Sequence, residues 1–269
     1  MSEIDTQDLE LLQAAARRAG ACAMGWFSDP GEVTEKSPGH PVTQADLETD
    51  ALLRDILCKA RPSYGWLSEE SIDDGSRLRA RRTFIVDPID GTRAFIAGKP
   101  HFTICLAVVE NGRPLSAVVY NPALEEMYCA QAGQGATCND VPITVGTATS
   151  LHLARMLAHD GLFSHKGWAK PWPKMHTGSR NSMAYRIALV GAGTWDACLT
   201  LQPKSDWDLA AADLIASEAG AIITDPDGQS FCYDLQNSTK VGVICAGPAL
   251  HALILERVLT SRQSGQNNE

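Results

Sequence analysis

The segment FIVDPIDGTRAF, residues 84–95, constrains the fold more than any other part of this 269-residue chain. It opens with a short apolar run typical of a buried strand. The run leads directly into two carboxylates, Asp87 and Asp90, which are held close together by the restricted backbone of Pro88. We therefore expect the chain to fold so that both carboxylates stand at the end of a strand, where the backbone turns into a short helix.

Two neighbouring carboxylates need an explanation, because adjacent negative charges destabilise one another unless a cation lies between them. A hard divalent ion such as Mg²⁺ or Mn²⁺ takes oxygen ligands of this kind. Gly91 and Thr92 then offer backbone N–H groups at a helix start, which suits a phosphate oxygen. Alternatively, Asp87 and Asp90 only form turns and cap a helix, as we expect for DPDG at 225–228. This motif alone does not separate the two interpretations.

Three further acidic clusters have the same two interpretations. Glu69 and Glu70, in WLSEES, follow an apolar segment and either project into the same site or are solvated. Asp46 opens a helix, where it is either a site residue or a helix cap. Asp208 lies in the first turn of an alanine-rich helix, where it either binds metal or compensates the helix dipole.

In order and spacing, the four clusters resemble the signature motifs of the inositol monophosphatase superfamily of magnesium-dependent, lithium-sensitive phosphatases. DPIDGT matches the central motif, and WD followed by small residues and EAG matches the C-terminal one. EES and VTxAD lie upstream in the expected order. The resemblance extends from about Lys36 to the final helix. It implies an α+β or α/β fold, a layered α-β-α-β-α sandwich with the metal site between its two halves.

The resemblance also implies roles for particular residues. Two or three Mg²⁺ ions, with Mn²⁺ as a possible substitute, would be coordinated by Glu69, Asp87, the carbonyl of Ile89, Asp90 and Asp208. Glu69 and Thr92, the latter hydrogen-bonded to Asp46, would position and activate the attacking water. The phosphate would be held by the amides of Gly91 and Thr92, so that the substrate contacts comprise Glu69, Ile89, Asp90, Gly91, Thr92 and Asp208.

The implied activity is Mg²⁺-dependent hydrolysis of a small-metabolite phosphate monoester by attack of a metal-activated water. Relatives that act on inositol phosphate typically carry a glutamate seven residues before the aspartate of the WD motif, where this chain has Leu201, with Gln202 and Lys204 nearby. A 3′(2′),5′-bisphosphate nucleotide or an inositol monophosphate is therefore the expected substrate. A histidinol-phosphate phosphatase is the alternative. Arg93, Lys99 and Lys204 are candidates for binding a second phosphate, or are ordinary surface cations.

A function of another class stays open, because some bacterial relatives are non-catalytic partners of the transcription and ribosomal RNA machinery. The run SRLRARR, residues 76–82, has four arginines that could bind RNA or an acidic protein. The alternative is a solvated loop before a strand. We expect no nucleic-acid partner, and the full set of carboxylates favours an active enzyme.

Composition narrows the cellular setting. Lys plus Arg is 23 and Asp plus Glu is 32, a net charge of −9 that argues against a surface that binds nucleic acid or anionic membrane throughout. No apolar run approaches the roughly 18 residues of a membrane span, and the acidic start is unlike a signal peptide. The eight cysteines form no CxxC pair, which favours free thiols and a cytoplasmic bacterial protein. Many superfamily members are dimers, so a homodimer is possible.

Periodicity predicts two halves, residues 1–146 and 147–269, without a flexible linker between them. In the first half we expect helices over about 5–27 and 45–60, with a loop over 28–41 between them, packed against an antiparallel or mixed sheet. Its expected strands are 82–87, 103–110, 115–120 and 126–130, with a hairpin turn at 111–114 and a glycine-rich turn at 131–140. In the second half strands 153–159, 196–201, 221–224 and 241–245 alternate with helices 182–193, 206–220 and 248–259.

Overall fold

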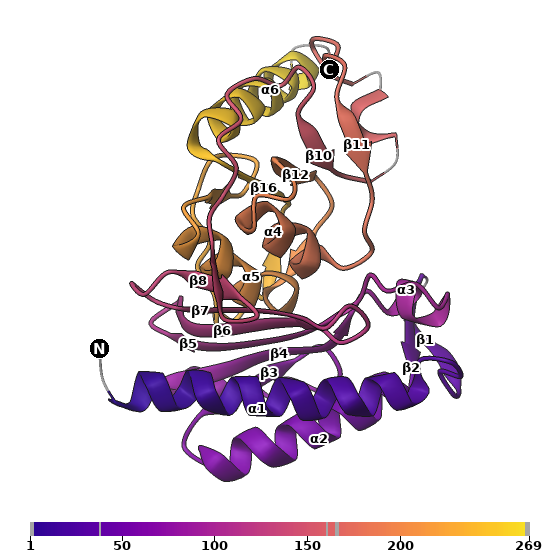
Figure 1. Cartoon of the computed structure of the whole chain (residues 1–269), viewed down its shortest axis with the longest axis vertical. Coiled ribbons are helices and arrows are strands. Elements are labelled where there is room, and N and C mark those ends of the chain that lie inside the picture. Colours follow the sequence, from indigo (N-terminus) through magenta and orange to yellow (C-terminus); the bar gives the residue numbers. More distant parts are fainter. Residues whose placement is uncertain (1–2, 38, 160, 165–166, 267–269) are drawn as a thin grey trace.

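The fold is a stack of five layers, seen edge-on in Figure 1. In the computed structural model, residues 3–37, 39–159, 161–164 and 167–266 are described. Helices α1 and α2 form one outer layer, and a seven-stranded sheet covers them. Helices α4 and α5 lie between this sheet and a second, five-stranded sheet, and α6 covers the far side. The predicted layered α-β-α-β-α sandwich is confirmed.

The first sheet is mixed, as predicted. Its strand order follows the sequence, with β3 and β4 parallel and every other neighbouring pair antiparallel. The predicted hairpin turn is present, since Glu110 pairs with Arg113 and both Asn111 and Gly112 have positive φ, as a two-residue turn requires. The strands are β3 (Gly65–Ser68), β4 (Arg82–Asp90), β5 (Thr103–Glu110), β6 (Arg113–Asn121), β7 (Glu126–Gln131), β8 (Ala136–Cys138) and β9 (Val141–Ile143).

Helices α1 (Glu3–Trp26) and α2 (Gln44–Ala60) bury apolar faces against this sheet. The buried stripe of α1 is mostly alanine, and small side chains let a helix approach a sheet closely. Thr43 caps α2 through a reciprocal pair of hydrogen bonds with Asp46. This cap fixes where α2 begins, and the contact between Asp46 and Thr92 places that start next to the end of β4.

The second sheet combines parallel and antiparallel pairs in the order β11-β10-β12-β16-β14. One apolar core joins α4 and α5 to both sheets, so the two halves share buried surface. The division at residue 146 falls in coil between the sheets and stays a prediction as a domain boundary. The elements are β10 (Arg155–Leu157), β11 (His176–Gly178), α4 (Met183–Gly191), β12 (Ala197–Thr200), α5 (Asp206–Glu218), β14 (Ile222–Thr224), β16 (Val243–Ala246) and α6 (Pro248–Gln266).

Short elements account for most differences from the sequence prediction. The segment expected as a loop contains a hairpin, β1 (Val33–Ser37) with β2 (His40–Thr43). All of β1 is exposed, so no apolar alternation marks it as a strand. The glycine-rich turn was predicted too long, because β8 begins inside it. The short helix predicted after Asp90 is present as α3 (Thr92–Ile96). The other short elements are β13 (Lys204–Ser205), β15 (Thr239–Lys240) and the 3₁₀ turns Ser76–Arg79 and Leu162–Ser164.

The arginine-rich segment is built into the chain by ion pairs. Arg77 is 1% exposed and contacts Asp73 and Asp234, which ties it to the second half of the chain. Arg82 pairs with Asp5, Asp8 and Glu110, and Arg81 also pairs with Glu110. Three of the four arginines therefore hold elements of the fold together.

Two other features bear on the sequence predictions. None of the helices among the described residues combines the length and the apolar character that crossing a membrane would need. All eight cysteines lie within the described residues and are free thiols, as predicted; Cys232 is exposed and the others are buried or half-buried.

Candidate active site

Three carboxylates meet where the two halves of the molecule face each other. Asp87 and Asp90 stand at the end of β4, and Asp208 lies in the first turn of α5. One oxygen of each lies within 4.8 Å of the others. Asp87 is 1% exposed and Asp90 is 6% exposed, so little water reaches them. The structure thus brings together carboxylates from two of the four sequence clusters.

The electrostatics of this cluster are unfavourable for three negative charges. Burial, together with the charges of Glu69, Asp90 and Asp208, raises the pKa of Asp87 well above its ordinary value. Burial and the charge of Asp208 raise the pKa of Asp90 to about 7. The pKa of Asp208 is also raised, mainly by burial. The charge of Lys204 offsets only part of these shifts for Asp90 and Asp208. Each shift therefore reports the free-energy cost of removing neighbouring carboxylates from water.

One atom of the cluster points to what would compensate it. Asp87 Oδ2 is buried and makes no hydrogen bond to any described residue, whereas Asp87 Oδ1 accepts from the amide of Ile89 at 3.0 Å. A buried carboxylate oxygen without a partner is costly. Clustered hard oxygen donors are the ligands that Mg²⁺ and Mn²⁺ prefer. The residues present therefore fit a divalent metal.

The chain fixes the orientation of each carboxylate. Asp90 Oδ2 accepts from the hydroxyl of Ser182 at 2.6 Å and from the amide of Ala184 at 2.7 Å, at the start of α4. Asp208 Oδ2 accepts from the amide of Ser205 at 2.7 Å, part of the cap of α5. These groups hold the carboxylates in place before a metal binds. The sequence motifs did not identify Ser182, although a serine before a helix is an ordinary cap signal.

Glu69 and Glu70 share a cation that no sequence motif indicated. Lys36 Nζ lies 2.8 Å from Glu69 Oε1 and 2.6 Å from Glu70 Oε1. Glu69 lines the same cavity as Asp90, as its predicted role requires, but it is not among the three carboxylates that lie within 4.8 Å. Burial raises the pKa of Glu70 to about 7 despite Lys36. Lys36 lies on the exposed strand β1, so only the hairpin places it next to the glutamates.

Asp46 and Thr92 are in contact, as the resemblance implied. Thr92 Oγ1 is 3.3 Å from Asp46 Oδ1 and 3.2 Å from the carbonyl oxygen of Ile89. The other oxygen of Asp46 accepts from the amide and the hydroxyl of Thr43. Asp46 therefore caps α2 and also touches the site, so the two interpretations of this residue do not exclude one another.

Glu69, Asp90, Thr92 and Asp208 border a cavity of about 700 Å³, large enough for a small metabolite as well as a phosphate group. Gly91 and Thr92 lie on its wall at the start of α3. Its lining also includes cations and histidines, most of which no motif indicated: His40, Arg93, Lys99, His101, His159, Arg186 and Lys204. The sequence offered no ligand-like spacing for the histidines, and only the fold gathers three of them on this wall.

The expectation that Leu201 contributes to the substrate pocket is wrong. Leu201 does not line this cavity but a separate hollow beside Trp168 and Val258. Its neighbours Thr200 and Gln202 line the cavity instead. Side chains alternate in direction in extended chain, so an error of one residue moves the side chain to the other face. The wall at this point is thus polar, formed by Thr200, Gln202 and Lys204.

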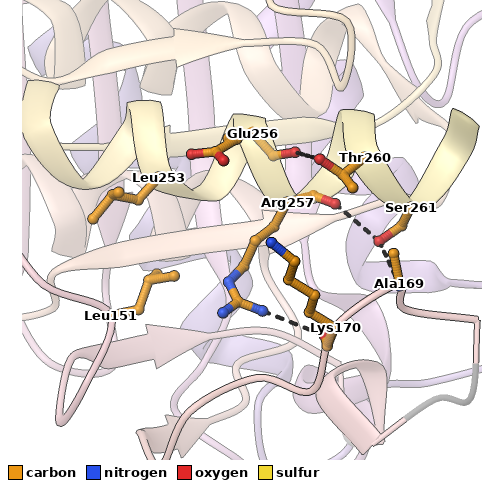
Figure 2. Close-up of a pocket in the computed structure, with 8 residues that line it drawn as sticks. All are labelled: Leu151, Ala169, Lys170, Leu253, Glu256, Arg257, Thr260 and Ser261. Carbon is orange, nitrogen blue, oxygen red and sulfur yellow. Dashed lines mark hydrogen bonds between the residues drawn. The ribbon is translucent and has the colours of Figure 1, made fainter.

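A smaller hollow of about 170 Å³ lies against α6 and is drawn in Figure 2. Arg257 donates to the carbonyl groups of Lys170 and Pro171, and the amide of Ala169 donates to the hydroxyl of Ser261. Glu256 is its only lining carboxylate among the described residues. These contacts hold residues 169–171 on α6, and the described lining offers no group of carboxylates comparable to the first site.

Comparison with known proteins places the chain in one family. The model of the inositol monophosphatase family matches residues 5–263. An inositol-1-monophosphatase from Rhizobium meliloti (strain 1021) is 37% identical over 205 residues, covering 73% of this chain and 76% of the relative. The chain belongs to the inositol monophosphatase family, which is a family of phosphoric monoester hydrolases.

Other matches agree on the fold but differ in name. The IMPase of Thermotoga maritima is 30% identical with a TM-score of 0.82, covering 97% of this chain and 99% of that one. A relative from Escherichia coli (strain K12), named Nus factor SuhB, is 32% identical over 235 residues. That match covers 82% of this chain and 85% of the relative. The family is therefore defined, whereas the names of its members point to more than one function.

Proposed function

We propose that this protein is a Mg²⁺-dependent phosphomonoesterase of small metabolites. The single observation that supports this most is the buried cluster of Asp87, Asp90 and Asp208, which forms no ion pair with the described residues and opens onto a cavity of metabolite size. Mg²⁺, when bound, would neutralise charge on the phosphoryl group and lower the pKa of water toward neutrality. Mn²⁺ has the same ligand preference and is a possible substitute.

The proposed ligands are those implied by the resemblance: Glu69, Asp87, the carbonyl of Ile89, Asp90 and Asp208. For Glu69 to bind a metal ion, its side chain must leave the ion pair with Lys36. The side chain of Glu69 is partly exposed, which permits this movement. Ser182 and Ser205 keep Asp90 and Asp208 oriented while this occurs.

Thr92 and Asp46 are proposed to orient the attacking water together with Glu69. The hydroxyl proton of Thr92 is directed at Asp46 Oδ1 or the carbonyl of Ile89, so a lone pair of Thr92 Oγ1 is left to accept a hydrogen bond from water in the cavity. Burial raises the pKa of Asp46, which favours proton uptake there. Phosphoryl transfer depends mainly on such positioning and on charge neutralisation.

The proposed substrate is an inositol monophosphate or a 3′(2′),5′-bisphosphate nucleotide, with histidinol phosphate as the alternative. The names of relatives favour the first, and the cations of the cavity favour a more anionic molecule. The test is phosphate release from inositol 1-phosphate, adenosine 3′,5′-bisphosphate and histidinol phosphate with Mg²⁺, without metal, and with added Li⁺. Turnover that is lost without Mg²⁺ and reduced by Li⁺ is expected; no turnover of any ester would contradict the proposal. The free thiols suit a reaction in the reducing cytoplasm.

A non-catalytic function has one observation in its favour, the name of the Nus factor SuhB relatives. The arginines from Arg77 to Arg82 do not add to it, because three of them are held in ion pairs within the chain. The two functions separate in one experiment: Asp90→Asn would abolish catalysis and preserve a scaffolding role. Whether the chain forms a homodimer stays a prediction.

A further inference from the structure

The first turn of α5 carries another aspartate, Asp206, which does not belong to the carboxylate cluster. It precedes Asp208 by two residues, and its side chain is fully buried. Asp206 Oδ1 lies 2.5 Å from Lys240 Nζ, and Asp206 Oδ2 accepts from the amide of Asp234 at 2.8 Å. A buried carboxylate needs such partners, because an unpaired charge in the interior is strongly destabilising. Asp206 therefore ties the start of α5 to the segment 234–240.

The same segment is joined to the first half of the chain. Asp234 Oδ1 accepts from Arg77 Nη1 at 2.5 Å, and Asp234 Oδ2 accepts from the hydroxyl of Thr83 at 2.8 Å. Thr83 lies on β4. A continuous path of hydrogen bonds thus runs from the first turn of α5, through Asp206 and Asp234, to β4. These two elements carry the three carboxylates of the cluster, so the path fixes the carboxylates relative to one another.

Lys240 also stands opposite a cation of the cavity. Strands β13 and β15 pair so that Lys204 is the direct partner of Lys240. Side chains of direct partners lie on one face of a sheet, about 5 Å apart at Cβ, and like charges there repel. Asp206 offsets the charge of Lys240, whereas Lys204 lines the cavity together with Asp208. The ion pair therefore reduces the repulsion that would push Lys204 out of its place in the cavity.

We propose that Asp206 and Lys240 are positioning residues of the active site, whose ion pair holds the first turn of α5, and with it Asp208, where it can share a metal ion with the carboxylates of β4. This rests on the proposed function and adds to it two residues that do not line the cavity. The cap of α5 supports it, because the amide of Ser205 donates to Asp208 Oδ2. Ser205 immediately precedes Asp206, so a displacement of Asp206 also displaces the group that orients Asp208.

The test measures metal binding directly as well as activity. Lys240→Met removes the cation and keeps most of the apolar stem of the side chain. We expect the Kd for Mg²⁺, measured by titration calorimetry on metal-free protein, to rise by about 10- to 100-fold, the usual effect of losing a group that orients a metal ligand. Phosphate release should fall by a similar factor at low Mg²⁺ and recover largely at saturating Mg²⁺. Lys240→Arg keeps the charge and is expected to raise the Kd less.

Two further variants separate positioning from stability. Arg155→Met breaks an ion pair with Asp196, and neither residue lines the cavity. It is expected to lower Tm and to leave the Kd for Mg²⁺ within about twofold. The double variant Asp206→Asn with Lys240→Met buries no unpaired charge, so its Tm should lie closer to that of the wild type than the Tm of Lys240→Met. Its Kd for Mg²⁺ should stay raised.

Each outcome decides the inference. If Lys240→Met lowers Tm but binds Mg²⁺ as tightly as the wild type does, the ion pair only stabilises the fold and the positioning role is wrong. If Lys240→Met does not fold, the double variant decides: a raised Kd for Mg²⁺ supports the role, and a wild-type Kd overturns it. Failure of the proposed function looks different, because the wild type itself would then hydrolyse none of the esters even at saturating Mg²⁺.

Discussion

Two segments of this chain have almost the same sequence and opposite environments. Asp87-Pro88-Ile89-Asp90-Gly91 and Asp225-Pro226-Asp227-Gly228 both place aspartates around a proline and end in glycine. In the first segment both carboxylates are buried beside a third. In the second, Asp225 Oδ1 accepts from two backbone amides of its own turn, at 2.8 and 2.9 Å, and the exposed Asp227 pairs with Arg262.

The difference shows what converts a turn into a candidate active site. Backbone amides satisfy Asp225, and Arg262 pairs with the exposed Asp227, so this segment does not need a metal ion. The strand before the first segment carries its carboxylates into the interior, and α5 adds Asp208 to them. The resulting repulsion between the three carboxylates favours binding of a cation, and this distinguishes the first segment from an ordinary turn.

The largest effect that would sharpen this comparison is on activity. We expect Asp90→Asn to lower kcat/KM by about 10³-fold, because it removes an anionic metal ligand that supports several kcal/mol of charge stabilisation. Asp225→Asn is the matched control and is expected to leave kcat/KM within about twofold, since asparagine can form the same turn. Steady-state kinetics with Mg²⁺ measure both. A loss of less than tenfold in Asp90→Asn would show that the buried cluster is not the catalytic centre.

A smaller loss of activity is expected when the contact between Thr92 and Asp46 is removed. Thr92→Val removes the hydroxyl that contacts Asp46 and is expected to lower kcat by about 10- to 100-fold. Thr92→Ser keeps the hydroxyl and is expected to retain most of the activity. Mg²⁺ affinity, measured by titration, should change little in either variant. Equal losses in the two variants would point to the methyl group, and hence to packing rather than to positioning of water.

Stability should depend on pH mainly through the buried segment. The folded pKa of Asp90 is raised to about 7 from an ordinary value of 3.8, so protonation favours the folded state. Its contribution to stability is present below the unfolded pKa and is lost as the pH rises through about 7. A shift of this size corresponds to a loss of about 4 kcal/mol between pH 4 and 8, which would lower the Tm of metal-stripped protein by about 8–16 °C.

Calorimetry at several pH values measures this effect. Added Mg²⁺ should raise Tm most at the high-pH end, where the carboxylates are charged. Asp90→Asn should flatten the pH dependence, and Asp225→Asn should not. If the Tm of the metal-stripped wild type instead rose from pH 5 to 8, the charged carboxylates would favour the folded state, and the expected direction would be wrong.

The smallest expected effect is at the turn. Asp225→Ala removes the side-chain acceptor of two amides and is expected to cost about 1 kcal/mol, or about 2–4 °C in Tm. Activity should be unchanged. A loss of activity in Asp225→Ala without loss of Tm would mean that this turn also contributes to function, and the comparison of the two segments would fail.

Local sequence determined most of the regular structure, because the relevant forces act between near neighbours. Apolar periodicity predicted α2, α5 and the central strands, since the buried face must repeat with the period of the element. Asn111-Gly112 predicted a hairpin, because both positions need positive φ. The acidic motifs likewise identified the residue types of the site before any contact between them was known.

Residues without such a local signal were missed. Lys36 sits on a fully exposed strand that has no apolar alternation, so its pairing with Glu69 depended on how the hairpin folds back. Arg186 lies on a helix that periodicity predicted, but which wall that helix forms depends on how it packs between the two sheets. From the sequence alone, Arg186 could not be distinguished from an arginine on the protein surface.

The sequence by itself therefore determined the elements, the acidic residue types and the resemblance to a family. Only the tertiary structure decided which of those residues share a site. It joined Asp208 to Asp87 and Asp90 from a distant part of the chain, left the similar turn at Asp225 outside, and placed Thr200 rather than Leu201 on the cavity wall. The physical reason is that contacts between distant residues, and which of two adjacent side chains faces a cavity, are fixed by packing and register, and neither is a property of any local stretch of sequence.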